Sequence, residues 1–234
     1  MPSPVGHSLA GLAFRGLARA LLRGRLRGRR SPPAARGRGR RALVGQAFTM
    51  AALVFAANAP DLDFVPGILA GEADRYHHGP AHSLGAAVLF GVVAWLVARL
   101  LRPRAAARFG LLMGLAFASH LVLDMFSLDM RAPNGVPLLW PLASTYFVLP
   151  AELFLDIQRI PEAPNFLASL LVWHNLVAML REAVVMGVVL GVGHAVWMAI
   201  GALRRPMSRR PLRREGEVER EVEVPRKVKV AGEG

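Results

Sequence analysis

Histidine and aspartate side chains recur at short spacings in the first half of the chain. Asp61 and Asp63 alternate in the segment PDLD, and His77 and His82 lie on either side of a Gly-Pro turn in the segment HHGPAH. Carboxylates one residue apart can share a cation where the chain folds back, and the turn can aim both imidazoles to the same side. Because imidazole nitrogen and carboxylate oxygen are ligands of divalent metals, these two segments offer four candidate ligands.

A third segment, SHLVLD, places His120 and Asp124 four residues apart. On a helix this spacing puts both side chains on one face, and an imidazole with a carboxylate is a usual way for one helix to supply two metal ligands. Each segment alone also has a plainer interpretation, such as a helix-capping aspartate or a coincidental pair of histidines. Cysteine is absent, so thiolate ligands are excluded. Taken together, the three segments favour a metal site.

Long apolar runs must position these segments. Hydrophobic residues make up 53% of the chain, which is too apolar for a typical soluble domain. A bilayer core needs roughly 20 apolar residues as helix. We therefore predict an all-α fold, a multi-span integral membrane bundle of about four to six helices. The predicted spans are 42–57, 83–98, 109–123 and 183–203; the run 166–180 is a fifth span or an interfacial helix, and 5–22 is an interfacial helix or a short span.

Basic residues are distributed very unevenly along the chain. Of the 29 lysines and arginines, 25 lie in the segments 15–41, 99–108 and 204–234. If these segments are cytoplasmic, as the positive-inside rule expects, the three ligand segments all fall at the extracytoplasmic ends of the helices. We divide the chain into a membrane-embedded domain, residues 1–203, with a basic insert at 23–41, and a charged cytoplasmic tail, residues 204–234, which we expect to be disordered.

Five segments in this order resemble the YdjM-type inner-membrane proteins, a family described as membrane-bound metal-dependent hydrolases. The family pattern runs from His-x-x-x-Gly through Pro-Asp-hydrophobic-Asp and His-Arg-Gly-x-Thr-His-Ser to His-x-x-x-Asp and Gly-x-x-x-x-Trp-Pro. The matching segments here are 7–11, 60–63, 77–83, 120–124 and 135–141. His78 stands where arginine is usual, which removes a permanent cation that could bind phosphate. Ala81 stands where threonine is usual, and the arginine-rich insert is an addition.

The resemblance adds His7 as a ligand and implies a hydrolase of the bacterial inner membrane. The metal ligands would be His7, Asp61, His77, His82, His120 and Asp124. Asp61 and Asp63 would be catalytic, with Asp63 bridging metals or orienting a metal-bound water. One or two zinc ions are expected, with Mn²⁺ or Mg²⁺ as alternatives, and the substrate would be a phosphoester or a lipid-linked molecule. His78, Ser83, Asp129 and Trp140 are candidates for contacting substrate or supporting the ligands.

The main alternative is a non-catalytic membrane scaffold or regulator. Its metal would fasten helix ends, and the basic insert at 23–41 would bind anionic lipid headgroups or a cytoplasmic partner. Nucleic acid is disfavoured as a partner because the basic run lacks interleaved aromatic residues and any recognisable binding module. An ion pathway is disfavoured because the candidate ligands gather at one face and no chain of acidic residues continues through the spans.

Overall fold

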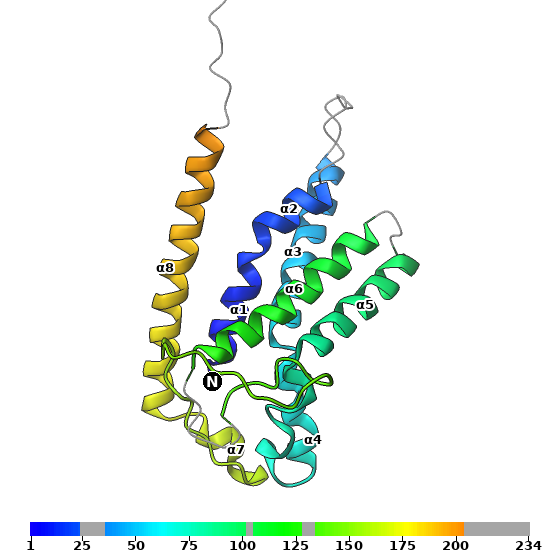
Figure 1. Ribbon diagram of the computed structural model, residues 1–234. Helices are drawn as coiled ribbons and strands as arrows, with labels where there is room; N and C mark the ends of the chain where they lie inside the picture. Colours follow the sequence, from blue (N-terminus) through cyan, green and yellow to red (C-terminus); the bar gives the residue numbers. More distant parts are fainter. Residues whose placement is uncertain (24–35, 102–104, 128–133, 204–234) are drawn as a thin grey trace, which may run out of the picture. The chain divides into compact units, whose positions relative to one another are not determined.

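The computed structural model describes residues 1–23, 36–101, 105–127 and 134–203. The described residues form α1 (Pro4–Ala13), α2 (Arg15–Arg23), α3 (Arg36–Asn58), α4 (Phe64–Leu69), α5 (Leu84–Leu101), α6 (Ala106–Met125), α7 (Ala163–Ser169) and α8 (Trp173–Leu203), shown in Figure 1. Three short 3-10 helices join them: η1 (Pro60–Asp63), η2 (Ala73–Tyr76) and η3 (Pro80–His82). The all-α prediction is confirmed. The chain divides into two units, Met1–Gly193 and His194–Gly234, and all contacts below lie within the first.

Among the described residues, three helices are long and apolar enough to cross a membrane: Leu84–Leu101, Ala106–Met125 and Trp173–Gly201. A fourth span is present if Leu43–Asn58 and Pro60–Leu69, which are bent by 56° at their junction, count as one. The predicted spans 42–57, 83–98 and 109–123 correspond to α3, α5 and α6. The prediction of a multi-span helical membrane protein is therefore confirmed.

The last apolar segments differ from the prediction. We expected separate helices at 166–180 and 183–203, but α8 runs without a break from Trp173 to Leu203, preceded only by the short α7. Arg181 and Glu182 interrupt the apolar run, but both are good helix formers, so the hydropathy boundary is not a helix boundary. The prediction of a separate helix over 166–180 is therefore wrong.

The first predicted helix, 5–22, is divided in two. Helix α1 ends at Ala13, where the N–H of Phe14 bonds to the carbonyls of Gly11 and Leu12, and α2 begins at Arg15. At 1.5 Å per residue, neither the 10 residues of α1 nor the 9 of α2 can cross a bilayer core alone.

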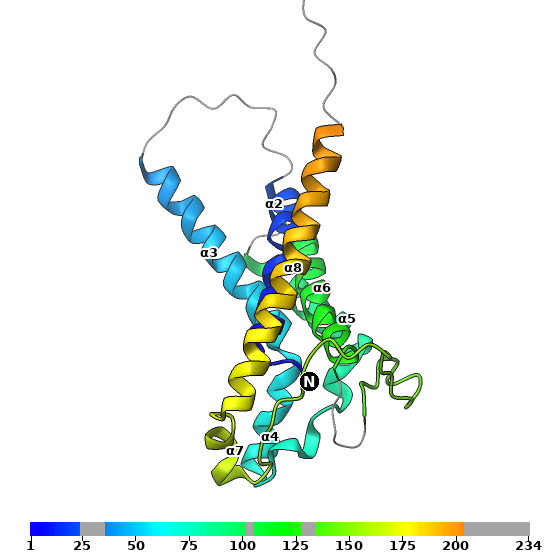
Figure 2. The same cartoon turned by 90° about the vertical axis from the view of Figure 1, so that its left-hand side faces the viewer.

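Close helix packing surrounds the candidate ligands. Helix α6 contacts α1, α2, α3 and α5, and α1 also packs on α3 (Figure 2). Two crossings depend on glycine: a Cβ at Gly11 of α1 would lie 2.7 Å from the carbonyl oxygen of Leu53 on α3, and a Cβ at Gly110 of α6 would lie 2.6 Å from that of Gly91 on α5. Small residues let helix backbones approach in this way in membrane proteins.

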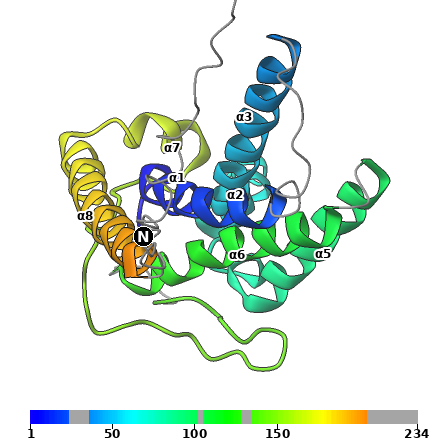
Figure 3. The ribbon, with the colours of Figure 1, turned by 90° about the horizontal axis from the view of Figure 1, so that it is seen from above.

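The ligand segments meet at one end of these helices. Helix α3 ends at Asn58 just before Asp61, α5 begins just after His82, and α6 ends just after Asp124. The described arginines of α2, α5 and α6 lie toward the other end, where Arg108 Nη1 donates to the carbonyl of Leu21 at 2.8 Å. Figure 3 shows α1 and α2 running along α6, with α5 beside it. Basic and ligand-bearing ends are therefore opposite.

Candidate metal centre

The structure brings the predicted ligands together at this end of the bundle. Most of the ligands come from α1, η1, η3 and α6, and His77 lies directly after η2. The side chains of His7, His82 and His120 are completely buried, and Asp124 is 2% exposed. Asp61 keeps the most solvent contact, with 15% of its side chain exposed.

Four ligand atoms from three segments form a compact group, which we call the four-atom group: Asp61 Oδ1, His82 Nε2, His120 Nε2 and Asp124 Oδ2. His120 Nε2 lies 3.1 Å from Asp124 Oδ2, 3.4 Å from Asp61 Oδ1 and 3.3 Å from His82 Nε2. His82 Nε2 lies 3.7 Å from Asp61 Oδ1 and 3.5 Å from Asp124 Oδ2. Ligand atoms placed tetrahedrally around zinc are about 3.3–3.6 Å apart, given bond lengths of about 2.0–2.2 Å. Three of the five separations fall in this range, and the other two, 3.1 and 3.7 Å, lie close to its limits.

The two imidazoles of this group are oriented by partners on their other nitrogen. His120 Nδ1 donates to the carbonyl oxygen of Ala57 at 2.8 Å, which leaves the Nε2 lone pair facing the group. His82 Nδ1 lies 3.1 Å from Asp63 Oδ2, within ion-pair distance but not aligned for a hydrogen bond, so Asp63 stands behind His82 rather than inside the four-atom group. Carbonyl or carboxylate partners of this kind fix the ring orientation and tautomer of metal-binding histidines.

Several of these atoms are buried without a hydrogen-bond partner among the described residues. They include both oxygens of Asp124, Oδ1 of Asp61 and both nitrogens of His7. Imidazole nitrogens lie as close as 3.1 Å to Asp124 but are not aligned for hydrogen bonds. Burial of carboxylates is costly unless a cation neutralises them. The buried histidine and aspartate groups can therefore hold a metal ion.

His7 lies against the other side of Asp124. Its ring stacks on that of His120, with centroids 3.6 Å apart and planes at 17°, and its Nε2 lies 3.5 Å from Asp124 Oδ1. Asp124 thus turns one oxygen to the four-atom group and the other to His7. Burial, assisted by the charge of His120, lowers the pKa of His7 to about 3, so its nitrogens are unprotonated at neutral pH and available as ligands.

His77 and His78 lie at the edge of the centre. His77 Nδ1 is bonded to Asp63 Oδ1 at 3.0 Å, and burial lowers its pKa. Ligand atoms of Asp61, Asp63 and His77 lie within 4.8 Å of one another, as do those of His77, His78 and His82, so a second ion could be held here. His78 is buried with φ of 56°, a left-handed conformation that is strained for a residue with a side chain.

Charge balance in the metal-free centre depends on His82. Burial would lower the pKa of this imidazole, but the carboxylates of Asp61 and Asp63 outweigh that effect and raise it to about 9. The ring therefore carries a proton at neutral pH when no metal is bound. That positive charge offsets part of the negative charge that a divalent cation would otherwise neutralise.

Ser83 has a structural partner at the start of α5. Its Oγ accepts a hydrogen bond from the N–H of Ala86 at 3.1 Å and donates to the carbonyl of Pro80 at 2.8 Å. This is the geometry of a helix N-cap. Ser83 thus holds the first turn of α5 directly after His82.

Trp140 lies in the loop 135–141, which packs on the same helix end. Its side chain is 42% exposed, and a Cβ at Gly85 would come within 2.9 Å of its carbonyl oxygen. The N–H of Leu84 donates to the carbonyl of Leu138 at 2.9 Å. The GVPLLWP segment therefore supports the start of α5. Asp129, the remaining candidate, lies outside the described residues.

Sequence reasoning missed Glu182. This side chain of α8 is completely buried and accepts hydrogen bonds from α1, the helix that carries His7. The available signal was that Glu182 is the one acidic residue between 163 and 203, and an ionisable group within a membrane segment is a functional candidate by default. In the sequence, Arg181 and Glu182 lie between the apolar runs 166–180 and 183–203.

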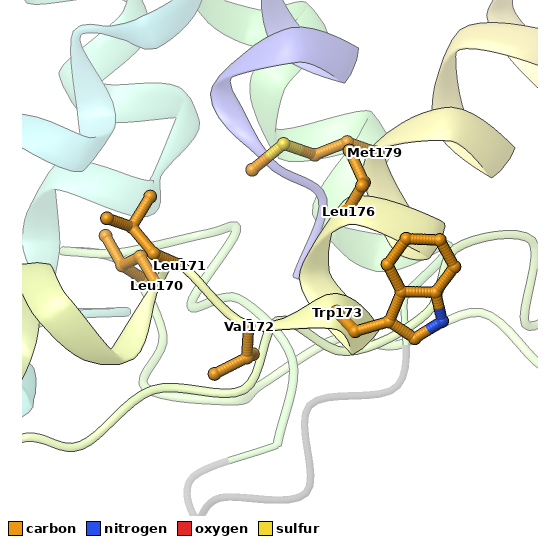
Figure 4. A pocket seen from close by; sticks show the side chains of 6 residues that line it. All are labelled: Leu170, Leu171, Val172, Trp173, Leu176 and Met179. Carbon is orange, nitrogen blue, oxygen red and sulfur yellow. The ribbon is translucent and has the colours of Figure 1, made fainter.

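An apolar hollow lies apart from these groups, at the turn between α7 and α8. Figure 4 shows its lining: Leu170, Leu171, Val172, Trp173, Leu176 and Met179. These side chains offer van der Waals contact to an apolar group but include no acid, base or nucleophile. Among the described residues, the side chains that could hold a metal ion lie instead in the histidine and aspartate groups.

Comparison with known proteins agrees with the motifs and the fold. A family model described as YdjM inner membrane protein matches residues 1–202, which include every ligand segment and nearly all of α8. No curated protein and no solved structure matches the chain. The family match and the apolar helices together show a membrane protein. The chain belongs to the YdjM inner membrane protein family.

Proposed function

We propose that the chain is a membrane-bound metal-dependent hydrolase that acts on a phosphoester or lipid-linked substrate. The observation that carries this proposal is the four-atom group, whose separations of 3.1 to 3.7 Å fit ligands around one divalent ion. The buried Asp124 oxygens without hydrogen-bond partners among the described residues support it, because buried carboxylate charge is costly unless a cation neutralises it.

The donor types favour zinc among the divalent ions. Two imidazole nitrogens and two carboxylate oxygens in tetrahedral spacing suit Zn²⁺, whereas Mg²⁺ takes octahedral oxygen ligands. Mn²⁺ also prefers oxygen-rich sites of higher coordination. A second ion also has room in this proposal. Its ligands could come from the set of Asp61, Asp63 and His77, or from the set that contains His7.

Each residue has a definite part in the proposed chemistry. His82, His120 and Asp124, whose ligand atoms all lie within 4.8 Å of one another, hold the ion, and Asp63 keeps the ring of His82 turned so that Nε2 faces it. When bound, a divalent ion lowers the pKa of a water molecule toward neutrality and stabilises negative charge on a phosphoryl or acyl oxygen. Asp61 is the most exposed residue of the four-atom group, so it stands at the fourth position, where water and substrate approach, and its carboxylate can accept a proton there.

The membrane orientation is part of the same proposal. The ligand segments and the arginines lie at opposite ends of α5 and α6, and 25 of the 29 basic residues belong to the segments near the arginine-bearing ends and to the tail. The positive-inside rule then places the basic insert in the cytoplasm and the metal centre at the extracytoplasmic face. A centre at headgroup depth suits a substrate with a lipid anchor and a polar phosphoester.

The proposal is tested by metal analysis of detergent-purified protein after chelation and reloading with Zn²⁺. Wild type should retain stoichiometric zinc, and both His82→Ala and Asp124→Ala should lose it. His174→Ala is the matched control, because His174 Nε2 bonds to the carbonyl of Asp156 at 2.9 Å and belongs to none of the ligand groups. A folded wild type without metal would exclude the proposed hydrolase.

Activity distinguishes a hydrolase from a scaffold with a structural metal. Zinc-loaded wild type should hydrolyse phosphoester lipids in mixed micelles, and Asp61→Asn should abolish turnover while the protein stays folded. Structural zinc sites are closed, whereas catalytic sites keep a position open for water or substrate. The scaffold would be favoured by two results together: no turnover, and a cobalt-substituted protein whose visible spectrum does not change when azide is added.

A further inference from the structure

Glu182 connects α8 to the helix that carries His7. Its Oε1 accepts the backbone N–H of Ser3 at 2.8 Å, and its Oε2 accepts the backbone N–H of Gly6 at 3.1 Å and the Ser3 hydroxyl at 2.5 Å. All three donors belong to the N-terminal end of α1. One buried carboxylate of α8 therefore satisfies backbone groups that the first turn of α1 would otherwise leave unpaired.

This contact is an electrostatic as well as a hydrogen-bonding one. A carboxylate at a helix N-terminus complements the positive end of the helix dipole, and charge-assisted hydrogen bonds are stronger than neutral ones. The approach is close: a Cβ at Gly6 would lie 3.0 Å from Glu182 Oε2. Glycine at position 6 thus lets the carboxylate reach the backbone of the residue that precedes His7.

The apolar contacts on the same side extend the connection toward the metal centre. Met186 of α8, one turn after Glu182, packs in one cluster with Ala10 of α1 and Leu123 of α6. Leu123 precedes Asp124 in the chain, and Ala10 lies on the same buried face of α1 as His7. A displacement of α8 would therefore disturb the placement of His7 against Asp124.

We propose that Glu182 is a positioning residue of the metal centre: by capping α1 it holds His7 against Asp124 and His120. This inference rests on the proposed metal-dependent function only in the role that it gives to His7. The capping itself is a property of the metal-free chain. An experiment can therefore test the two separately.

Glu182→Gln is the sharpest perturbation, because the side chain keeps its size. Both oxygens of Glu182 accept a backbone N–H. In either orientation of the amide, the NH₂ group of glutamine would therefore face a donor, and one buried N–H would lose its partner. Arg181→Gln is the matched control. Arg181 is the exposed neighbour on the same helix, and it donates to the carbonyl of Glu152 at 3.3 Å.

The first measurement is labelling of histidines in metal-free protein with diethyl pyrocarbonate, read by mass spectrometry. His7 is completely buried in wild type, so it should be labelled slowly there and in Arg181→Gln, and severalfold faster in Glu182→Gln. Ser3→Ala removes one of the three donors, so it should also speed the labelling of His7, but less than Glu182→Gln does. It also keeps the test informative if Glu182→Gln does not yield folded protein. Unchanged labelling of His7 in both variants would overturn the inference.

The second measurement is Co²⁺ affinity and spectrum in a double-mutant cycle with His7→Ala. Glu182→Gln should weaken Co²⁺ binding about tenfold, as expected for residues that support ligands, and should change the visible spectrum as His7→Ala does. In the His7→Ala background it should cause no further loss. Equal losses in both backgrounds would show a general structural effect and overturn the positioning role. If wild type binds no Co²⁺, the proposed function fails while the labelling still decides whether Glu182 places His7.

Discussion

The affinity of the centre for metal should rise with pH, because a proton occupies His82 in the metal-free protein. The carboxylates of Asp61 and Asp63 raise the pKa of His82 to about 9 despite its burial. Its Nδ1 faces Asp63, and its Nε2 belongs to the four-atom group. A metal ion that binds Nε2 must therefore displace a proton. Since the metal-free form holds this proton and the metal-bound form does not, a higher pH favours binding.

The size of the effect follows from that pKa. At about pH 7, two units below the pKa, the apparent dissociation constant for Zn²⁺ should be about 100-fold larger than its limiting value at high pH. The proton on His82 contributes a fall of about tenfold per pH unit from about pH 7 to 8, and this contribution levels off above about pH 9. His7, with a pKa of about 3, and His77, with a lowered pKa, are already neutral in this interval and add nothing to the slope.

Isothermal titration calorimetry in two buffers of different ionisation enthalpy counts the protons released on binding. Wild type should release at least one proton at about pH 7, because the proton on His82 must leave. Asp63→Asn removes one of the carboxylates that raise the pKa, so it should release a clearly smaller fraction at about pH 8. Glu152→Gln, at an exposed carboxylate, should behave as wild type. Stoichiometric zinc binding with no proton release and no pH dependence would refute the assignment of His82 as a ligand.

Two further predictions concern the helices that carry the ligands. Gly11→Ala should lower the melting temperature in detergent and cost about 1–3 kcal/mol, because its Cβ would lie 2.7 Å from the carbonyl oxygen of Leu53; Gly16→Ala, with nothing within 4 Å, should be neutral or stabilising. Equal melting temperatures of these two variants would contradict the close crossing of α1 and α3. Ser83→Ala should cost about 1 kcal/mol by removing the cap of α5 and leave zinc stoichiometry unchanged. A loss of zinc would instead assign Ser83 to the centre.

Parts of the centre could be predicted because their geometry is set within one element. His120 and Asp124 are four residues apart on α6, and the structure places His120 Nε2 3.1 Å from Asp124 Oδ2. Helix α3 ends at Asn58, two residues before Pro60, which cannot continue the helical hydrogen bonds. Helical spacing and proline chemistry are local properties, and the sequence therefore predicts them directly.

Other parts depend on how distant segments return to one another. That Asp63 contacts His82 and His77 rather than joining the four-atom group follows from the path of η1, η2 and η3, which spacing along the chain does not determine. The unbroken α8 was missed for a different reason. A hydropathy boundary records where apolar residues stop, whereas a helix ends where backbone hydrogen bonding ends, and Arg181 and Glu182 permit it to continue.

The five motifs end at residue 141, but the family match continues to residue 202. The contacts of α8 explain why a centre built from the first part of the chain depends on the last helix. His7 belongs to a helix of only 10 residues, too short to be stable alone in water, and Glu182 satisfies the free N–H groups at its start. A chain that ended after residue 141 would keep every motif and lack this cap. The motifs supply the ligands, and α8 supplies one of the constraints that bring them together.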